Sequence, residues 1–549
     1  MTARRIREHP ATVLAGAAML VSAGLLLHWL GRLTFWRDEW NFLLHRRGWS
    51  PGTFLDPAVE HLSTIPILLY KLQVETFGMS SPPRSYQVVA VLGFLASVAL
   101  LFIYVRRRLG EWLALAAILP ILFLGPSWDD LLFPYQIGFF GSMACGLASL
   151  LLLDRPTRGK DIAVSALLVA SLLFSDAGIP YVAAAAVSVA LDPERRRRAF
   201  VPLVPAVLWV IWYLGWGHTA DTFVSLHNAA NVPSYVLDGI SSSLATWLGL
   251  NIPAAPFRES SLDWGRPLLV LAIVVGAWRL HRLRRVPGQL LVALTVLVGF
   301  WALTGLNTSV FGPPTAGRYQ YIGVIGLVLV AAELARGVRV ARWATIGVLA
   351  VALVASLANV SRLKDAAHGL EGIAQQQRGG LAALELARDT VSQDLELTEQ
   401  NSGVDYLGLL DAGSYLSAVD AYGSPAYTAS ELPRAPEAGR VAADKVSALA
   451  LGAALVPAEE MPATACVTVH PELRPAVIEV PRQGILMTAR SAGTVAALHR
   501  FASQSFPFSL GTLPRGTQVL FRIQPDRSTR PWALQLSGGG PVLACRPGG

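Results

Sequence analysis

The chain has 549 residues, of which 53% are hydrophobic and only 15% charged, and its mean hydropathy is +0.46. Soluble globular proteins carry about a quarter charged residues, so this composition indicates an integral membrane protein. The net charge of +8 does not indicate a nucleic-acid partner, because the arginines cluster between long apolar runs and no nucleic-acid-binding motif accompanies them. Three cysteines are too few for a disulfide-rich scaffold or a zinc ribbon.

Apolar runs that approach the width of a bilayer recur along the first 360 residues. The first, at 11–31, is followed by no small-residue cleavage site, so we expect an uncleaved helix. The others lie at 84–105, 111–126, 135–153, 161–174, 179–191, 200–216, 266–281, 288–305, 319–335 and 342–360. They predict about eleven membrane-spanning helices. The segment 62–77 also carries Lys71 and Glu75, which favours a helix at the membrane interface.

Basic residues predict the orientation of these helices. Clusters of arginine and lysine precede the first run and follow every second one, so an eleven-helix arrangement places them all on one side. The intervening loops 126–134 and 174–180 contain neither Lys nor Arg. By the positive-inside rule the protein lies in the plasma (inner) membrane with its N-terminus in the cytoplasm. The external side then holds the loops 32–83 and 217–265 and everything after residue 360.

The C-terminal part of the sequence changes its pattern twice. We expect a transmembrane domain over 1–360, followed by a connecting region at 361–462 in which residues 361–400 have the spacing of an amphipathic helix. From 463 to 549, short β-type runs punctuated by Pro and Gly predict a small extracytoplasmic β-sandwich. These runs lie at 466–473, 476–481, 484–489, 518–523 and 532–537. Cys466 and Cys545 bracket the module and are either two free thiols or, as we favour in an oxidising compartment, a disulfide.

Acidic residues in the first external loop are the first candidates for a functional site. Asp38 and Glu39 closely follow the first predicted helix and lie between two tryptophans, which are typical anchors at the membrane interface. A carboxylate there could act as general base toward a hydroxyl, or hold a divalent cation against a phosphate. The alternative is a solvated acidic pair at a helix end, partly neutralised by Arg37.

The order of motifs in this region resembles a known family of membrane enzymes. An acidic pair follows the first helix. After it come Glu or Asn, then His or Lys, and then a proline and a tyrosine. This order is similar to that in the GT-C class of polyprenyl-phosphate-dependent glycosyltransferases. The likeness is greatest to the group of protein O-mannosyltransferases and lipid A aminoarabinose transferases. The matching residues are Asp38, Glu39, Glu60, His61, Pro66, Tyr70, Phe77 and Gly78. The resemblance covers residues 10–155, and the later helices only in topology.

The resemblance implies roles for the residues of these motifs. Asp38 would be the catalytic base or organise the acceptor, with Glu39 as its partner. Glu60 and His61 fall where relatives hold substrate or a divalent metal ion, and Tyr70 belongs to the same substrate-binding motif. In this chain a Leu-Ser-Thr-Ile stretch separates the histidine from the proline that relatives often place almost adjacent to it. The alternative for Glu60 and His61 is a polar pair at the start of the following helix.

Two other external positions carry candidate substrate-binding residues. Asp129 and Asp130 lie in a predicted loop to which GT-C relatives often contribute acidic residues; their alternative role is interaction with a helix dipole. Arg318 and Tyr319 follow a Gly/Pro-rich loop at the start of a predicted helix. The planar guanidinium can bind two phosphate oxygens, although an Arg-Tyr pair is also a usual interfacial anchor. We interpret Asp176 first as a turn residue.

The sequence therefore predicts a polytopic α-helical, GT-C-like membrane protein with an extracytoplasmic α+β domain. As an enzyme it would transfer a sugar from a polyprenyl-phosphate donor to an envelope glycan, lipid or protein. The sequence has no Walker A, G-x-S-x-G or H-E-x-x-H motif, and the predicted helices have few internal charges, which argues against proton-coupled transport. The alternative is a non-enzymatic transporter of lipid-linked glycans, or an envelope assembly protein, with the same architecture.

Overall fold

The computed structural model describes two compact units. The described residues are 9–58, 61–154, 157–191, 198–251, 262–308, 312–404, 410–458, 461–505 and 508–548. The first unit comprises Met1–Gly31, Arg46–Gln73 and Arg84–Gly369, and the second comprises Arg32–His45, Val74–Pro83 and Leu370–Gly549. The predicted external loop 32–83 is thus divided between the two units, which the sequence pattern did not indicate.

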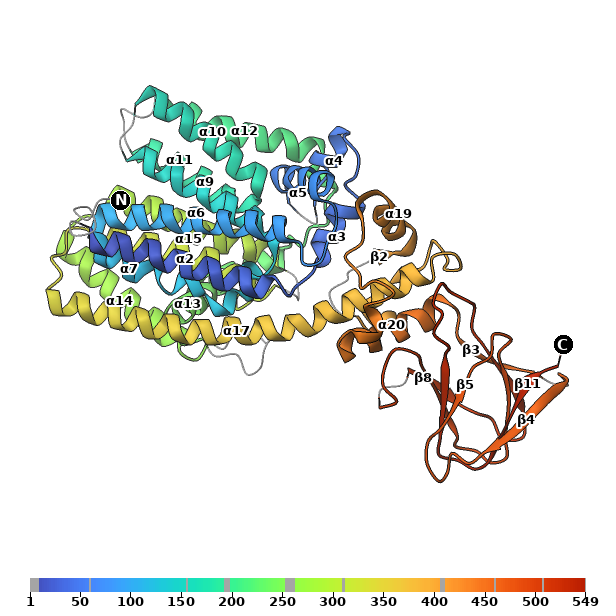
Figure 1. Ribbon diagram of the computed structural model, residues 1–549. Helices are drawn as coiled ribbons and strands as arrows, with labels where there is room; N and C mark the ends of the chain where they lie inside the picture. Colours follow the sequence, from blue (N-terminus) through green and yellow to red (C-terminus); the bar gives the residue numbers. More distant parts are fainter. Residues whose placement is uncertain are drawn as a thin grey trace. The chain divides into compact units, whose positions relative to one another are not determined.

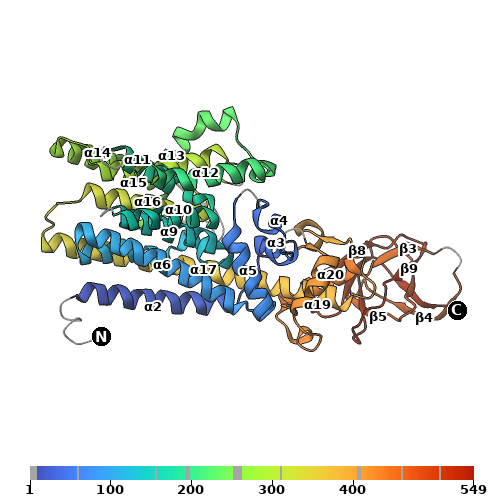
Figure 2. The same cartoon turned by 90° about the horizontal axis from the view of Figure 1, so that it is seen from above.

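The first unit is built from helices whose sequences are dominated by Leu, Val and Ala. They are α2 (Pro10–Leu30), α4 (Pro51–Leu55), α5 (Thr64–Phe77), α6 (Arg84–Leu109), α7 (Glu111–Ile118), α8 (Trp128–Leu131), α9 (Ile137–Leu153), α10 (Arg158–Phe174), α11 (Ile179–Leu191), α12 (Phe200–Gly215), α13 (Leu226–Trp247), α14 (Gly265–Leu283), α15 (Gly288–Leu306), α16 (Gly317–Leu334) and the first part of α17 (Arg342–Leu386). Figures 1 and 2 show the long helices of this unit side by side, with α9 packed against both α6 and α10. Helix α15 packs against α11, α13 and α16.

Some of these helices have the length and composition of membrane spans. Among the described residues, five pass on both criteria: Pro10–Leu30, Arg84–Leu109, Pro134–Leu153, Gly288–Leu306 and Arg342–Leu386. The pair Glu111–Phe123 and Gly125–Leu131, bent by 45°, makes a sixth if it is counted as one span. Several other predicted runs form helices shorter than the roughly 20 residues that cross a bilayer unaided. The expected number of about eleven spans stays a prediction.

Two predicted segments join in one element. The last predicted span, 342–360, and the amphipathic helix expected at 361–400 form the continuous 45-residue helix α17, which ends at Leu386. Its first part belongs to the first unit, and the part from Leu370 belongs to the second. Residues 396–397, which we expected to be helical, form a short strand instead, because they pair with Leu410 and Asp411.

The second unit combines a few helices with three β-sheets. Its helices, besides the end of α17, are α3 (Arg37–Leu44), α18 (Glu399–Ser402), α19 (Ala412–Tyr422) and α20 (Glu437–Ala450). Its strands are β1 (Glu396–Leu397), β2 (Leu410–Asp411), β3 (Ala454–Pro457), β4 (Ala463–Val469), β5 (Ala476–Glu479), β6 (Ile485–Ala489), β7 (Val495–His499), β8 (Phe508–Thr512), β9 (Gln518–Arg522), β10 (Ala533–Ser537) and β11 (Val542–Pro547). The two larger sheets have the orders β5-β10-β7-β8 and β3-β9-β6-β11-β4. Every described strand pairing is antiparallel except a single bridge between Ala489 and Arg515.

The two larger sheets bury alternate side chains, which is the pattern of sheets that share a core. Leu534 and Leu536 on β10, and Val519 and Phe521 on β9, are at most 3% exposed, whereas the residues between them are less buried. The four later β-type runs contain β5, β6, β9 and β10, and the first, 466–473, overlaps β4, which begins at Ala463. The five-stranded sheet begins earlier than the expected boundary at 463, because β3 pairs with β9.

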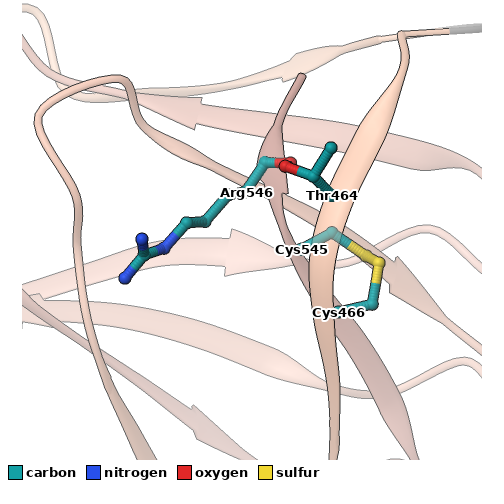
Figure 3. The surroundings of a disulfide bond; sticks show 4 residues. All are labelled: Thr464, Cys466, Cys545 and Arg546. Atoms are coloured by element: carbon teal, nitrogen blue, oxygen red, sulfur yellow. A yellow bond between two sulfur atoms is a disulfide. The ribbon is translucent and has the colours of Figure 1, made fainter. Parts of the chain in front are cut away.

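A disulfide joins the two strands at one edge of the five-stranded sheet. Cys466 on β4 and Cys545 on β11 have an S–S distance of 2.10 Å and Cα atoms 4.0 Å apart (Figure 3). Strand β4 is the edge strand, and all but the last of its seven residues are exposed. The disulfide therefore fastens a strand that few apolar contacts hold in place.

The sheets are anchored to α20 by one buried carboxylate. Asp444 accepts hydrogen bonds from the backbone N–H groups of Arg500, Phe501 and Ala502, with donor–acceptor distances of 2.7, 3.0 and 2.9 Å. The Arg500 side chain forms a buried ion pair with Asp526 at 2.8 Å and lies 4.1 Å from the ring centroid of Trp532. Trp532 is thus part of this packed core.

Candidate functional site

The first turn of α16 is held close to the segment that connects α7 to α9. Helix α16 packs against α8 and against the 3-10 turn η2 (Gly125–Ser127). The contact is so close that a Cβ atom on Gly317 would lie 2.3 Å from the carbonyl oxygen of Pro126 and 2.6 Å from Oδ1 of Asp129. Only glycine fits at the start of α16, and its absence of a side chain lets the carboxylate of Asp129 reach the end of the helix.

Asp129 faces the positive end of α16. Burial disfavours its carboxylate, and the guanidinium of Arg318 and the backbone N–H groups of Arg318 and Asp130 offset part of that cost. A carboxylate at a helix N-terminus interacts favourably with the helix dipole, so Asp129 has the dipole partner that the sequence allowed. The helix concerned is α16, about 190 residues further along the chain, rather than the segment that directly follows Asp129.

Asp130 is completely buried beside this contact. Its exposed fraction is 0%, and neither of its carboxylate oxygens has a hydrogen-bond partner among the described residues. It interacts electrostatically with Asp129, Arg318 and Tyr321, and the hydroxyl of Tyr321 is hydrogen-bonded to Ser97. A buried carboxyl group without a hydrogen bond is costly, so Asp130 stays a candidate for a functional role.

Arg318 is surrounded by groups that fix its position. The guanidinium carbon lies 5.0 Å from the ring centroid of Tyr319, and Asp129 and the phenol of Tyr135 act on it electrostatically. A guanidinium has five N–H donors in a planar fork, a geometry that matches the oxygens of a phosphate. The nearby carboxylate of Asp129 offsets part of its positive charge.

A cavity of about 200 Å³ adjoins Tyr319. Its apolar wall includes Phe139, Ile179, Pro180, Phe300 and Leu303. Its polar lining includes His61, Asp176, Thr304, Asn307 and Tyr319. One water needs roughly 10–15 Å³ in the same measure, so the cavity has room for much more than a single water. An apolar wall facing a few convergent polar groups is typical of a small-molecule site.

His61 and Asp176 form a pair within the cavity lining. The Nδ1 atom of His61 lies 3.3 Å from Oδ2 of Asp176, and the indole N–H of Trp209 donates to Oδ1 of the same carboxylate at 3.0 Å. Ser175 caps the 3-10 turn that carries Asp176, with its hydroxyl accepting from the N–H of Ala177. We interpreted Asp176 first as a turn residue; it does begin this turn, and it also lines the cavity.

The structure therefore places the candidate residues of the first unit in two adjoining groups, which meet at Tyr319. Asp129 and Asp130 contact the region of Arg318, Arg318 stacks on Tyr319, and Tyr319 lines the cavity that His61 also lines. Glu60 lies outside the described residues. The substrate-binding roles of all these residues remain predictions.

Tyr70 lies at the contact between α5 and α6. It is 2% exposed, and its ring packs on that of Tyr86 with centroids 4.9 Å apart, which joins α5 to α6. It does not belong to the lining of the cavity next to Tyr319. The neighbouring Lys71 is also buried; its ammonium donates to the carbonyl oxygen of Arg47 at 2.6 Å and lies over the ring of Trp49.

Asp38 and Glu39 belong to the first turn of α3, in the second unit. Glu39 is completely buried and accepts a hydrogen bond from the backbone N–H of Trp36 at 2.8 Å, which is the acidic half of a capping box, because the indole of Trp36 can accept none in return. Asp38 is partly exposed, and the side chain of Arg37 pairs with Glu399 at 2.5 Å. Glu39 thus holds the turn that presents Asp38, and the catalytic roles of both remain predictions.

The described residues offer few metal ligands in one place. Among the described residues, no group of three or more His, Cys, Asp or Glu side chains is close enough together to hold a metal ion. His61 and Asp176 supply an imidazole and a carboxylate, which are both common ligands. The predicted ligand Glu60 lies outside the described residues, so a divalent metal ion stays a prediction.

Solved structures similar to this chain include two of one protein, and no family model and no curated protein matches the chain. Both are crystal structures of ArnT from Cupriavidus metallidurans, one bound to undecaprenyl phosphate and one in the apo state. The first is 14% identical, with a TM-score of 0.46, and the match covers 74% of this chain and 84% of that chain. The second is 14% identical, with a TM-score of 0.47, covering 77% of this chain and 90% of that chain.

Proposed function

We propose that this protein is a membrane glycosyltransferase that takes a sugar from a polyprenyl-phosphate donor and passes it to an acceptor outside the cytoplasm. The proposal rests on the motif resemblance in residues 10–155 and on the site at the start of α16. The observation that carries it is the guanidinium of Arg318, which interacts with Asp129 and lies near the ring of Tyr319, a residue that also lines the cavity. A donor with a phosphate next to a sugar fits a cation next to such a cavity.

Arg318 would bind the phosphate of the donor. Its N–H groups can donate two parallel hydrogen bonds to phosphate oxygens, and the positive end of α16 adds to the attraction. When the bond between sugar and phosphate breaks, negative charge grows on the leaving phosphate. A cation already fixed in place stabilises that charge without reorganising, which lowers the barrier of the chemical step. The sugar would lie in the adjoining cavity, with its less polar face against the apolar wall.

Asp38 would act as the general base. By the motif resemblance it would take the proton from the acceptor hydroxyl as the hydroxyl oxygen displaces the phosphate at the anomeric carbon. A single displacement of this kind inverts the anomeric configuration. A divalent metal held by Glu60 and His61 would supply further charge stabilisation at the phosphate. The acceptor would be an envelope glycan, lipid or protein, and the second unit would bind it or support the loop of α3.

A transfer assay tests this function. Purified protein is incubated with radiolabelled polyprenyl-phosphate sugars and envelope acceptors, and Asp38→Asn is compared with wild type. Asp365→Asn, on an exposed position of α17, is the matched control. We expect transfer by the wild type and by Asp365→Asn, and a loss of about 10²–10⁴-fold in Asp38→Asn, the usual contribution of a general base.

Two results would redirect the assignment. Equal transfer by Asp38→Asn and wild type would remove Asp38 from the mechanism. No transfer from any donor, by a protein that still binds polyprenyl phosphate, would favour the non-enzymatic alternative of a lipid-linked glycan transporter or assembly protein.

A further inference from the structure

The β-rich module at 463–549 carries most of the net charge of the protein. It contains nine Arg, no Lys and three acidic residues, which is a formal charge of +6, whereas the whole chain has +8. Two glutamates, at 459 and 460, precede the module and lie outside the described residues. The other 462 residues together are therefore nearly neutral, and the positive charge is concentrated in one small part of the second unit.

Most of these arginines are exposed and have no acidic partner in the part of the chain that the structure describes. Arg500 is buried against Asp526, and Arg527 pairs with Asp389. The other seven are exposed, and their side chains form no ion pair or hydrogen bond with a described residue: Arg474, Arg482, Arg490, Arg515, Arg522, Arg530 and Arg546. Like charges held close together repel one another and oppose folding. Such a surface suits a partner of opposite charge.

Four of the seven lie at the same end of the two larger sheets. At this end β5, β9 and β11 finish and β6 and β10 begin, as the pairings of Ile485 with Phe521 and of Ala533 with Glu479 show. The short segment 480–484 joins β5 to β6, so the ends of the two sheets lie together. The arginines here, which we call the basic end, are Arg482 before β6, Arg522 on β9, Arg530 before β10 and Arg546 on β11.

The basic end is a broad surface. Strands β9 and β11 lie on either side of β6, so Arg522 and Arg546 are on strands about 10 Å apart. Arg530 leads into β10 of the other sheet, and stacked sheets are also about 10 Å apart. Figure 3 shows the Arg546 side chain extending away from the disulfide. Guanidinium groups spread in this way fit a ligand whose negative groups repeat along its length better than a single small anion.

The same end offers little to the interior of a lipid bilayer. Among the described residues of the module, the exposed large apolar side chains are those of Val467, Leu473 and Val477. They lie on β4, in the loop after β4 and on β5, and none of them adjoins an arginine of the basic end along the chain. A surface that binds at a membrane interface combines basic with apolar side chains. Of the three acidic residues of the module, only Glu479 is exposed at this end, so the positive charge is in excess there.

We propose that the basic end binds an anionic glycan of the cell envelope, a polymer with a negative group on successive sugars. The proposal rests on the proposed function for the side of the membrane and for the role of this polymer as the acceptor. Several weak contacts, each dependent on salt, would hold the polymer without fixing one position along it. That suits an acceptor that is used at more than one place.

The test measures binding of the full chain, in nanodiscs of phosphatidylcholine, to polygalacturonate, which has one carboxylate per sugar. Dextran is the neutral comparison. One variant changes all four arginines of the basic end to Gln, and a second changes them to Lys. The control is Arg474→Gln/Arg490→Gln/Arg515→Gln, which removes exposed arginines of the opposite end, where Arg515 bridges to Ala489 at the end of β6.

We expect wild type to bind polygalacturonate and not dextran. Exposed charge pairs contribute little singly, so the loss of four should weaken binding by about 10–100-fold. The Lys variant, which keeps the charge, and the control should stay within about threefold of wild type. Raising the salt from about 0.1 M to about 1 M should abolish binding, because charges are then screened beyond roughly 3 Å.

Equal affinity of wild type and the Gln variant would overturn the proposal, as would an equal loss in the control. Tighter binding to phosphatidylglycerol vesicles than to the polymer, through the same arginines, would replace the glycan with a lipid surface. Binding is measured without a donor, so it is separate from the proposed function. A protein that binds the polymer through the basic end but transfers no sugar would refute the transferase assignment and the acceptor role, and would leave the glycan site in place.

Discussion

Removing the disulfide between Cys466 and Cys545 should strongly destabilise the β-rich part of the second unit. The two cysteines are 79 residues apart, so the bond closes a loop that contains almost all of both larger sheets. In the chain-entropy model a loop of this length stabilises the folded state by about 4.5 kcal/mol at 25 °C. That is a large part of the roughly 5–15 kcal/mol that stabilises a typical domain.

The measurement is pulse proteolysis in urea on the full-length protein, following the fragment that contains the sheets. The Cys466→Ser/Cys545→Ser variant should lose about 3–5 kcal/mol, and β4 should be cut first because it is an exposed edge strand that pairs only with β11. Cys145→Ser, which changes the remaining cysteine on α9 in the first unit, should leave this transition unchanged. A loss below about 1 kcal/mol in the double variant would refute the reasoning that loop closure dominates the effect.

Two further predictions concern a close contact and a carboxylate. Gly317→Ala should cost about 1–3 kcal/mol of stability and also lower transfer, because the added methyl group must push α16 away from Asp129. The control is Gly347→Ala on α17, where no atom lies within 4 Å of the added Cβ. In thermal unfolding and transfer assays it should change neither stability nor transfer. The hydrogen bond from the backbone N–H of Ser503 lowers the pKa of Glu437 in the folded protein. The ionised Glu437 therefore stabilises the folded state above pH ~4.3, and this stabilisation is lost as the pH falls through the lowered pKa. Urea unfolding between pH 6 and 3 should therefore show a steeper loss of stability in wild type than in Glu437→Gln; parallel curves would contradict this.

The sequence predicted those helices and strands whose pattern lies within a single short segment. Short β-type runs predicted β4, β5, β6, β9 and β10, because alternation and Pro/Gly punctuation are properties of the strands themselves. Apolar runs likewise predicted most of the helices of the first unit. The basic clusters placed Asp129 and Arg318 on the same side of the membrane, which is a necessary condition for the contact that the structure shows between them.

Contacts between distant segments could not be predicted from one sequence. The pairing of His61 with Asp176 joins residues 115 positions apart, and no local signal marks it. The division of the first external loop between two units depends on packing such as that of Trp40 on Tyr415, with ring centroids 5.9 Å apart. The sequence only partly indicates the capping role of Glu39. The residue lies three positions after Trp36, as the acidic residue of a capping box does, but Trp36 takes the place usually held by serine or threonine.

The binding of polyprenyl phosphate by the α16 site tests the central claim most directly. The dissociation constant for this lipid, without a sugar, is measured for wild type, for Arg318→Gln, and for Arg266→Gln, which removes an exposed arginine paired with Asp238. Charge-assisted hydrogen bonds contribute about 1.5–3 kcal/mol, so Arg318→Gln should weaken binding by about 10–100-fold, and Arg266→Gln should leave it unchanged. Equal affinity of wild type and Arg318→Gln would contradict a phosphate site at the start of α16.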